Sequence, residues 1–230
     1  MIKISINIRM NTSSESQSDG NFAKSSHNSL RILGFMGLLL GFLVVLIGTL
    51  FYNQSFFTSI SASATYYGTM YILPFVLGGI SVYFWGYQGY DEKDRICTKI
   101  MSVAAFLTAM FQCKSIYNVQ EFQIGLLALP PFYSGIIHSV SAAALFITLI
   151  IWIGFLFRKS SGQPTAQKGH RNKIYSISAC AMFIGTLLFF FGFYKASDKF
   201  PIIWLAEVII LIPASLAILI KSGALLKDKS

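Results

Sequence analysis

The chain has 230 residues, of which 54% are hydrophobic and 12% charged, and its formal net charge is +9. A soluble domain carries about 25% charged residues, so half that share over the whole chain excludes a soluble globular protein and indicates a lipid bilayer as the solvent. The positive charge flanks apolar segments, as it does in membrane proteins. The sequence therefore predicts membrane lipids, and no nucleic acid, as partners.

Six apolar segments are long enough, at about 18 residues or more, to cross the roughly 30 Å hydrocarbon core of a bilayer. Inside lipid every backbone group must be bonded within its own segment, so each segment is predicted to be a helix. The weakest is the third, because Lys99 lies near its start and must snorkel to the headgroups. The predicted fold class is an all-α integral membrane protein, a six-transmembrane-helix bundle over residues 32–220, with spans at 32–52, 69–87, 96–113, 135–157, 174–194 and 200–220.

Two short terminal segments flank this domain. Residues 1–31 are predicted to be a disordered tail, because 11–29 are rich in Ser and Asn, and residues 221–230 form a short basic tail. With six spans both termini share one side of the membrane, and that side holds 15 of the 18 Lys and Arg residues. Cytoplasmic loops accumulate Lys and Arg. We therefore expect both termini to be cytoplasmic.

Several chemistries are excluded by the positions of the residues that they need. Cys97, Cys113 and Cys180 contain no CxxC pair, and the predicted topology places the first two near opposite faces of the membrane, too far apart for a disulfide. The three histidines also lie on different sides, so they cannot share a metal or ligate a haem between spans. Neither a nucleophile elbow nor a phosphate-binding glycine loop is present. The sequence predicts no catalytic residue, metal or cofactor, and it favours a non-enzymatic protein without excluding an enzyme.

Polar residues of the apolar segments gather toward the predicted outer face. Glu207 lies about 10 Å below the outer end of the sixth segment, and His138 lies near the outer start of the fourth. The connection between the first two segments has no charge and many hydroxyl groups, among them those of Ser61, Tyr66 and Tyr67. Such a loop can fold back into a bundle, because its hydroxyls can bond local backbone groups.

Each of these residues has more than one interpretation. An acid within a span is costly and normally faces the bundle interior, so Glu207 is either a hydrogen-bonded tie between helices, a ligand- or ion-handling group, or an acid–base catalyst. His138 also fits interfacial packing, and the Tyr66–Tyr67 pair fits an aromatic belt. The charged turn at 86–95 is expected to be a solvated cluster of ion pairs.

Short motifs along the chain resemble those of a known family. These are "SISASATYYGTM" (59–70), "GYQGYDEKD" (86–94), a His at the outer start of the fourth segment, "RNKIY" (171–175), and a Trp–Glu pair before "KSG" (221–223). Their order resembles an uncharacterised family of small six-helix bacterial integral membrane proteins. The chain is also distantly similar to the Frag1/DRAM/Sfk1 group, which is associated with lipid organisation. The resemblance implies a bacterial inner (plasma) membrane location.

Position by position, the resemblance selects ten residues: Ser59, Ser61, Tyr66, Tyr67, Tyr90, Asp91, His138, Asn172, Trp204 and Glu207. The chain departs from the family pattern at Tyr71, where an arginine is expected after the methionine. If such an arginine pairs with the glutamate of the sixth segment in the family, that pairing is lost in this chain.

Two functions remain open. The first is a non-enzymatic polytopic membrane protein that binds or organises a lipid or small apolar ligand in a pocket opening to the outer face. The second is a small secondary transporter or proton-coupled carrier that uses Glu207. The candidate ligand-binding residues are Glu207, His138, Ser61, Tyr66, Tyr67 and Trp204.

Overall fold

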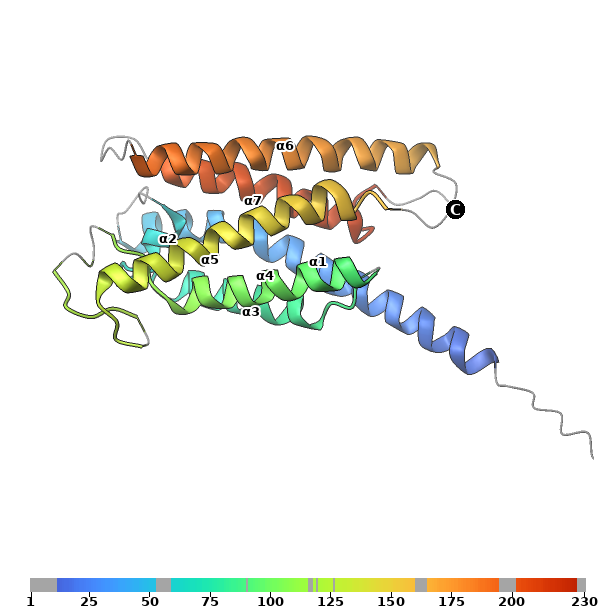
Figure 1. The fold of residues 1–230 in the computed structure, drawn as a ribbon, viewed down its shortest axis with the longest axis horizontal. Coiled ribbons are helices and arrows are strands. Elements are labelled where there is room, and N and C mark those ends of the chain that lie inside the picture. Colours follow the sequence, from blue (N-terminus) through green and yellow to red (C-terminus); the bar gives the residue numbers. More distant parts are fainter. Residues whose placement is uncertain are drawn as a thin grey trace, which may run out of the picture.

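The computed structural model describes residues 12–52, 59–89, 91–115, 118, 120–125, 127–159, 165–194 and 202–226, with the backbone alone at 12–26 and 193–194. Over these residues the protein is all α-helical, and its only strand-like pairing is an isolated bridge between Ile124 and Leu129. The helices, shown in Figure 1, are α1 (Thr12–Tyr52), α2 (Ile60–Ser63), α3 (Ile72–Gly86), α4 (Glu92–Met110), α5 (Pro131–Ile151), the π-helical turn η1 (Trp152–Leu156), α6 (Ala166–Tyr194) and α7 (Ile202–Lys221).

Four helical segments are long and apolar enough to cross a membrane: His27–Tyr52, Pro131–Leu156, Ala166–Gly192 and Ile202–Lys221. They match the predicted first, fourth, fifth and sixth spans, so the protein is a helical membrane protein. The predicted spans 69–87 and 96–113 are also helical, over α3 and α4. However, α3 has only 15 residues, and α4 begins with the charged run Glu92–Arg95. Neither reaches the length and composition of the other four.

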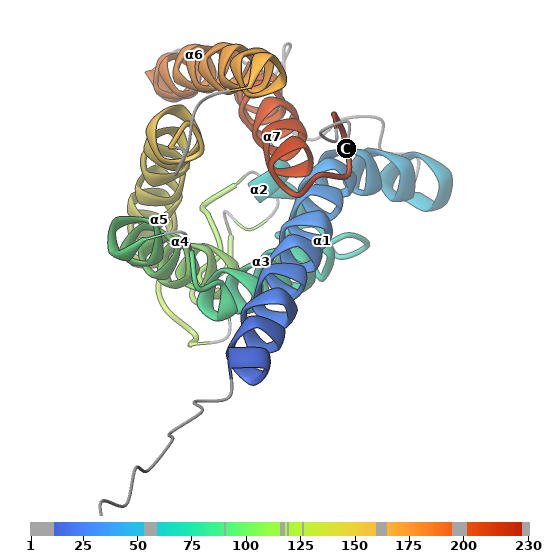
Figure 2. The same cartoon turned by 90° about the vertical axis from the view of Figure 1, so that its right-hand side faces the viewer.

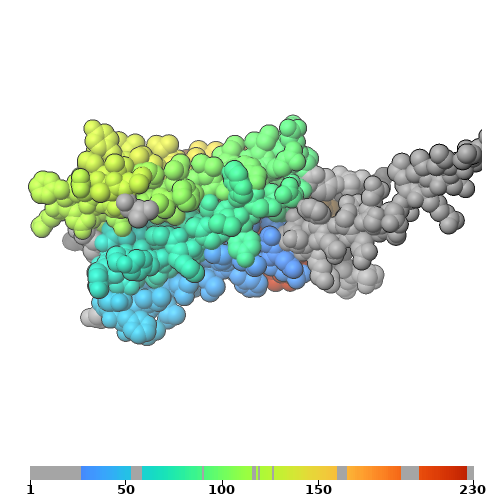
Figure 3. Space-filling view, turned by 90° about the horizontal axis from the view of Figure 1, so that it is seen from below, coloured from blue at the N-terminus to red at the C-terminus, as the bar shows by residue number. Residues whose placement is uncertain are grey.

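The six α-helices other than α2 form a closed ring in chain order, as the view along the bundle shows (Figure 2). Each helix packs beside the next, and α7 closes the ring by packing against α1. The space-filling view shows α1, α3 and α4 side by side on one face (Figure 3). We call the end that holds α2 and residues 111–130 the hydroxyl end. The opposite end, where α4 and α6 begin and α7 ends, is the basic end.

The N-terminal part of α1 differs from the sequence prediction. Residues 12–31 were expected to be disordered, but they form the first part of a 41-residue helix that runs past the basic end (Figure 1). Once a helix is nucleated in the apolar segment, each added residue gains one hydrogen bond. "TSSE" at 12–15 also has the pattern of a capping box. Residues 1–11 of the predicted tail, and 227–230 of the C-terminal one, lie outside the described residues.

The short helix α2 explains why α3 is short. Ser59 caps α2 by accepting a hydrogen bond from the Ala62 backbone N–H at 2.8 Å, and the chain then makes successive turns up to Ile72. These residues sit at the hydroxyl end beside α1 and α3. They occupy the space into which a longer α3 would extend. As a result, α3 begins three residues after the start of the predicted span.

Two helix termini at the basic end, the start of α4 and the end of α7, carry defined caps. Asp91 begins α4 by accepting from the Asp94 backbone N–H at 2.9 Å, with two acids in the first turn, where the helix dipole favours negative charge. At the end of α7, Gly223 adopts a φ of 70° and the Ala224 N–H bonds the Leu219 carbonyl at 3.1 Å. This is a Schellman motif, whose left-handed position requires glycine.

Glycines allow α7 to approach its two neighbours closely. A Cβ atom added at Gly34 of α1 would lie 2.6 Å from Leu219 Cγ, and one at Gly185 of α6 would lie 2.8 Å from Ile210 Cγ1 and 3.1 Å from the Ala206 carbonyl oxygen. Small residues at helix interfaces are how membrane helices gain packing contacts, because lipid supplies no hydrophobic driving force between them.

Replacing Gly185 by alanine is expected to destabilise the bundle by about 1–3 kcal/mol, the usual cost of overpacking. The matched control is Gly78→Ala in α3, where an added Cβ meets no atom within 4 Å and helix propensity favours alanine. Thermal loss of the monodisperse species in detergent measures both. Equal melting temperatures for the two variants would show that the α6–α7 contact is not tight.

Candidate functional site

Glu207 lies inside the bundle and binds the first turn of α2. Only 4% of the residue is exposed. One carboxylate oxygen accepts from the Ser61 hydroxyl at 3.1 Å, and the other accepts from the backbone N–H of Ile60. Glu207 was expected to face the bundle interior, within reach of the loop hydroxyls or of His138, and these contacts show the first of the two alternatives.

The geometry makes Glu207 a cap for α2 that comes from another helix. The first N–H groups of a helix lack partners within it, and Ser59 satisfies that of Ala62. Glu207 satisfies that of Ile60. A carboxylate at a helix N-terminus is also favoured by the helix dipole. The arrangement fastens α2 to α7, two segments that are 147 residues apart in the chain.

A chain of polar contacts continues from α2 to α4 and α5. The side-chain amide of Gln112 donates to the Ala64 carbonyl at 3.1 Å, and Ser134 donates its hydroxyl to the Gln112 carbonyl at 2.8 Å. Thr65 and Ser115 share a hydrogen bond between their hydroxyls. The hydroxyl end is therefore held together by groups from α2, α5, α7 and the segment after α4.

His138 is buried at this end but does not reach Glu207. Its Nδ1 lies 2.7 Å from the Phe111 carbonyl and 3.0 Å from that of Thr108. Because both partners are acceptors, Nδ1 carries the hydrogen. His138 thus bonds carbonyls at the C-terminus of α4, where orphan carbonyls need donors. The hypothesis of a Glu207–His138 pair is not supported by the geometry.

The three aromatic candidates lie in different environments. Tyr66 is half-buried, with its ring edge-on to that of Tyr52 at a centroid distance of 6.0 Å. Tyr67 is 82% exposed, as an aromatic-belt residue would be. Trp204 is half-buried one turn before Glu207 and packs against the core. Of the six predicted site residues, the structure shows Glu207 and Ser61 in direct polar contact.

At the basic end the structure shows a cluster that the sequence did not predict. Asp94 was expected to be solvated, but it is 3% exposed and accepts a hydrogen bond from the indole N–H of Trp152. Its neighbour Asp91 is exposed and pairs with Lys159, and the hydrogen bond from that lysine lowers the Asp91 pKa. The sequence carried no signal of their contact, because Asp94 precedes the predicted span 96–113 whereas Trp152 lies within the span 135–157.

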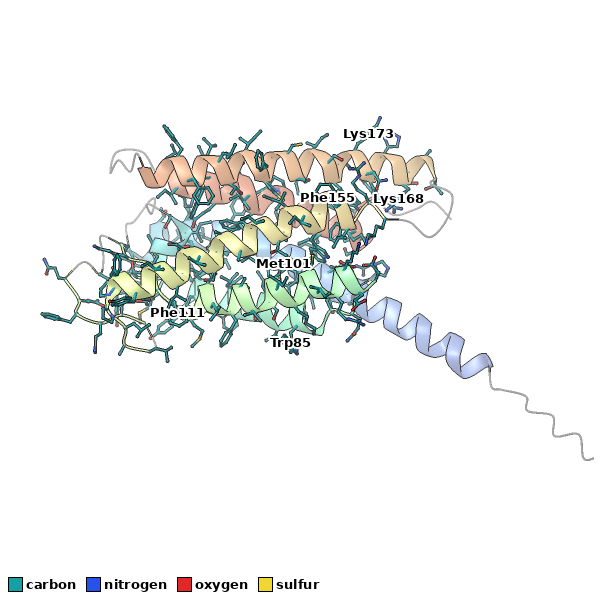
Figure 4. The ribbon with its side chains drawn as sticks, in the orientation of Figure 1. Trp85, Met101, Phe111, Phe155, Lys168 and Lys173 are labelled. Atoms are coloured by element: carbon teal, nitrogen blue, oxygen red, sulfur yellow. The ribbon has the colours of Figure 1, made fainter. Side chains whose placement is uncertain are left out.

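The π-helical turn η1 completes this cluster. The Phe157 N–H bonds the Trp152 carbonyl at 3.0 Å, five residues back, and the two rings lie 4.4 Å apart. In an α-helix, positions five residues apart are about 140° apart around the axis, so these rings would not meet. The Phe157 carbonyl accepts from Lys168 at 3.0 Å and from Lys221 at 3.2 Å. Lys168, labelled in Figure 4, projects from α6 toward this turn.

An apolar groove with a volume of about 650 Å³ lies between α4 and α5. Its walls include Val103 and Leu107 from α4 and Ile136 and Val140 from α5, and Lys99 lies at its end nearest the basic end. Val140 is 65% exposed, so the groove opens to the outside of the ring, toward lipid. None of the six predicted site residues lines it. The expected pocket at the outer face is therefore not this groove.

Comparison of the chain with models of protein families, with curated proteins and with solved structures found no match. The resemblance to small six-helix bacterial membrane proteins thus stays a prediction. Among the described residues no three His, Cys, Asp or Glu side chains are grouped so as to hold a metal ion.

Replacing Glu207 by leucine is expected to free α2, because the Ile60 N–H and the Ser61 hydroxyl lose their acceptor. A hydrogen bond to a charged group stabilises by about 1.5–3 kcal/mol, so opening of α2 should become at least tenfold more frequent. The measurement is labelling of Ala64→Cys, a buried position, by a membrane-impermeant maleimide in a background without the native cysteines. Tyr67→Cys, at an exposed position, serves as the labelling control.

Glu207→Gln separates the hydrogen bonds from the charge. Its amide oxygen can accept from Ile60 and its NH₂ group can donate to the Ser61 oxygen, so labelling at residue 64 should stay near the level of the parent protein. Unchanged labelling in Glu207→Leu would refute the tie between α2 and α7. Fast labelling in Glu207→Gln would show that the charge itself holds α2.

Proposed function

We propose that this helical membrane protein is a six-span bundle with both termini in the cytoplasm, located in the plasma membrane of a bacterium, and that it binds a lipid without catalysing a reaction. The observation that carries the lipid is the apolar α4–α5 groove, which opens sideways rather than toward water. Its volume lies within the roughly 300–1,000 Å³ typical of ligand sites.

The six-span proposal is supported by the outward faces of the two less apolar helices. Phe75 and Val82 of α3 are 80% and 71% exposed, and Val103 and Phe106 of α4 are about half-exposed. Large apolar side chains on the outside of a ring need lipid around them. The chain also runs through successive helices of the ring in alternating directions, as the colours of Figure 1 show. A partial span of α3 is supplemented by the α2 segment at the hydroxyl end.

The non-enzymatic proposal is supported by how the buried polar groups are used. Glu207, Ser61 and His138 all bond groups of the protein, and these bonds explain their burial without a substrate. Direct contact between Glu207 and a base such as His138 would have favoured catalysis. The geometry instead favours the structural interpretation of Glu207.

A proton-coupled carrier remains the second candidate. It is favoured by one observation, a buried carboxylate on the interior of α7 that is bound to the start of the short helix α2. Protonation of Glu207 would remove the charge that caps α2. Proton uptake by proteoliposomes that is lost in Glu207→Gln would support this function, and its persistence in that variant would exclude it.

The topology predicts opposite results for two reporter fusions. A reporter that is active only in the cytoplasm should work when it is fused after Ser160 and fail after Gln120, because these positions flank the fourth span on opposite sides. Activity after Gln120 with none after Ser160 would show that the protein has the opposite orientation in the membrane. Activity at both sites would mean that α5 does not cross the membrane.

Lipid binding predicts that phospholipid stays with the protein through purification. We expect about one or more tightly held phospholipids per chain in a mild detergent, measured by native mass spectrometry after extensive washing. A membrane protein of similar size without a lateral groove is the control. Complete loss of lipid under conditions in which the protein stays folded would contradict the proposed function.

A further inference from the structure

The α4–α5 groove carries a more specific inference, which rests on the proposed lipid-binding function. Lys99, Val103 and Leu107 are spaced four residues apart along α4, so they lie on one face of the helix. From Lys99 to Leu107 the groove extends about 12 Å along the axis. That length is close to the roughly 15 Å of hydrocarbon in one leaflet, half of the bilayer core.

The chemistry changes along the groove from apolar to positive. Toward the hydroxyl end the walls are Ile, Val, Leu and Ala side chains, and the hydroxyl of Ser141, the other polar residue of the lining, donates to the Ile137 carbonyl at 2.6 Å. At the opposite end stands the ammonium group of Lys99. One turn further, Arg95 continues the same face of α4 and is exposed.

Lys99 is held in place by Trp85 of α3. Its ammonium group donates to the Trp85 carbonyl and lies 4.2 Å from the centroid of the indole ring. Trp85 is 58% exposed and points outward from the bundle in Figure 4. Exposed Trp residues of membrane proteins concentrate at the interface between headgroups and hydrocarbon. A Lys99 donor that is not used by the carbonyl can face a phosphate.

Of the three acids at the start of α4, the exposed Glu92 lies about two turns from Lys99 and one turn from Arg95, and the other two are engaged elsewhere. Asp94 is turned into the bundle, where Trp152 binds it, and Asp91 pairs with Lys159. We propose that the groove holds one acyl chain of an anionic phospholipid from the leaflet at the basic end, with its phosphate at Lys99. Charge complementarity favours this occupant over a second copy of the chain, whose helix would have to pack against the lysine. Bulky Ile and Val walls also differ from the small-residue interfaces at which membrane helices associate.

The test uses purified, delipidated full-length protein offered equal amounts of palmitoyl-oleoyl phosphatidylglycerol and phosphatidylethanolamine, with bound lipid counted by native mass spectrometry. The parent protein should retain the anionic lipid preferentially. Lys99→Gln should lower that preference about fivefold, which corresponds to the roughly 1 kcal/mol that one lysine contributes near an anionic surface. Lys93→Gln, an exposed lysine of α4 outside the groove, is the matched control and should leave the preference unchanged.

A second pair of variants tests the acyl chain. Val103→Trp fills the groove and should reduce retention of both lipids, whereas Val82→Trp, on the exposed face of α3, should not. Retention that is insensitive to Val103→Trp, or a preference that is insensitive to Lys99→Gln, overturns the inference while leaving lipid binding elsewhere intact. A parent protein that holds neither lipid overturns the proposed function itself. If Val103→Trp instead dissociates a dimer without releasing lipid, the groove binds a second copy of the chain, and the inference is wrong.

Discussion

Hydrocarbon offers no hydrogen-bond partner, so a polar group that enters the membrane must find one in the protein. This constraint fixes the two ends of the bundle. At the hydroxyl end the carboxylate of Glu207 is satisfied by the start of α2. At the basic end the carboxylate of Asp94 is satisfied by the indole of Trp152. Each contact joins segments that are distant in the chain, α2 with α7 and α4 with η1. Each therefore specifies which helices pack together, a choice that nonspecific apolar packing would leave open.

The two ends meet the constraint with different chemistry. The hydroxyl end uses backbone groups, because the first N–H groups of α2, like those of any helix, have no partner within it and a side chain from α7 supplies an acceptor. The basic end uses aromatic rings. Phe84 and Tyr87 each stand edge-on to Trp152, with centroids 5.6 and 5.7 Å away, and Phe157 is brought to it by the π-helical turn. Between the two ends, small residues such as Gly185 let the helices approach.

The sequence predicted what depends on composition and failed where a partner had to be chosen. Apolar length located four spans and the direction in which Glu207 faces, because those follow from the cost of exposing charge to lipid. It could not pair Glu207 with Ile60 rather than His138, since both lay at the same predicted depth and the choice depends on the turn that begins α2. It missed Asp94 because a cluster of charges at a helix start is usually solvated. The π-turn could not be predicted from the sequence. A single turn with one added residue does not detectably change the hydrophobic periodicity of one helix of 26 residues.

The bonds that Glu207 makes to α2 bear on where a ligand can bind. Access to Glu207 would require α2 to leave its place, breaking the bonds that keep a carboxylate in the bundle. The outside of the ring has no such cost, because its side chains already face lipid, and a groove there exchanges one apolar neighbour for another. In the proposed lipid site, selectivity would come from the one charged side chain of the α4–α5 groove, a lysine that an exposed tryptophan holds in place. A site of this kind separates lipids by headgroup charge while it treats their acyl chains alike.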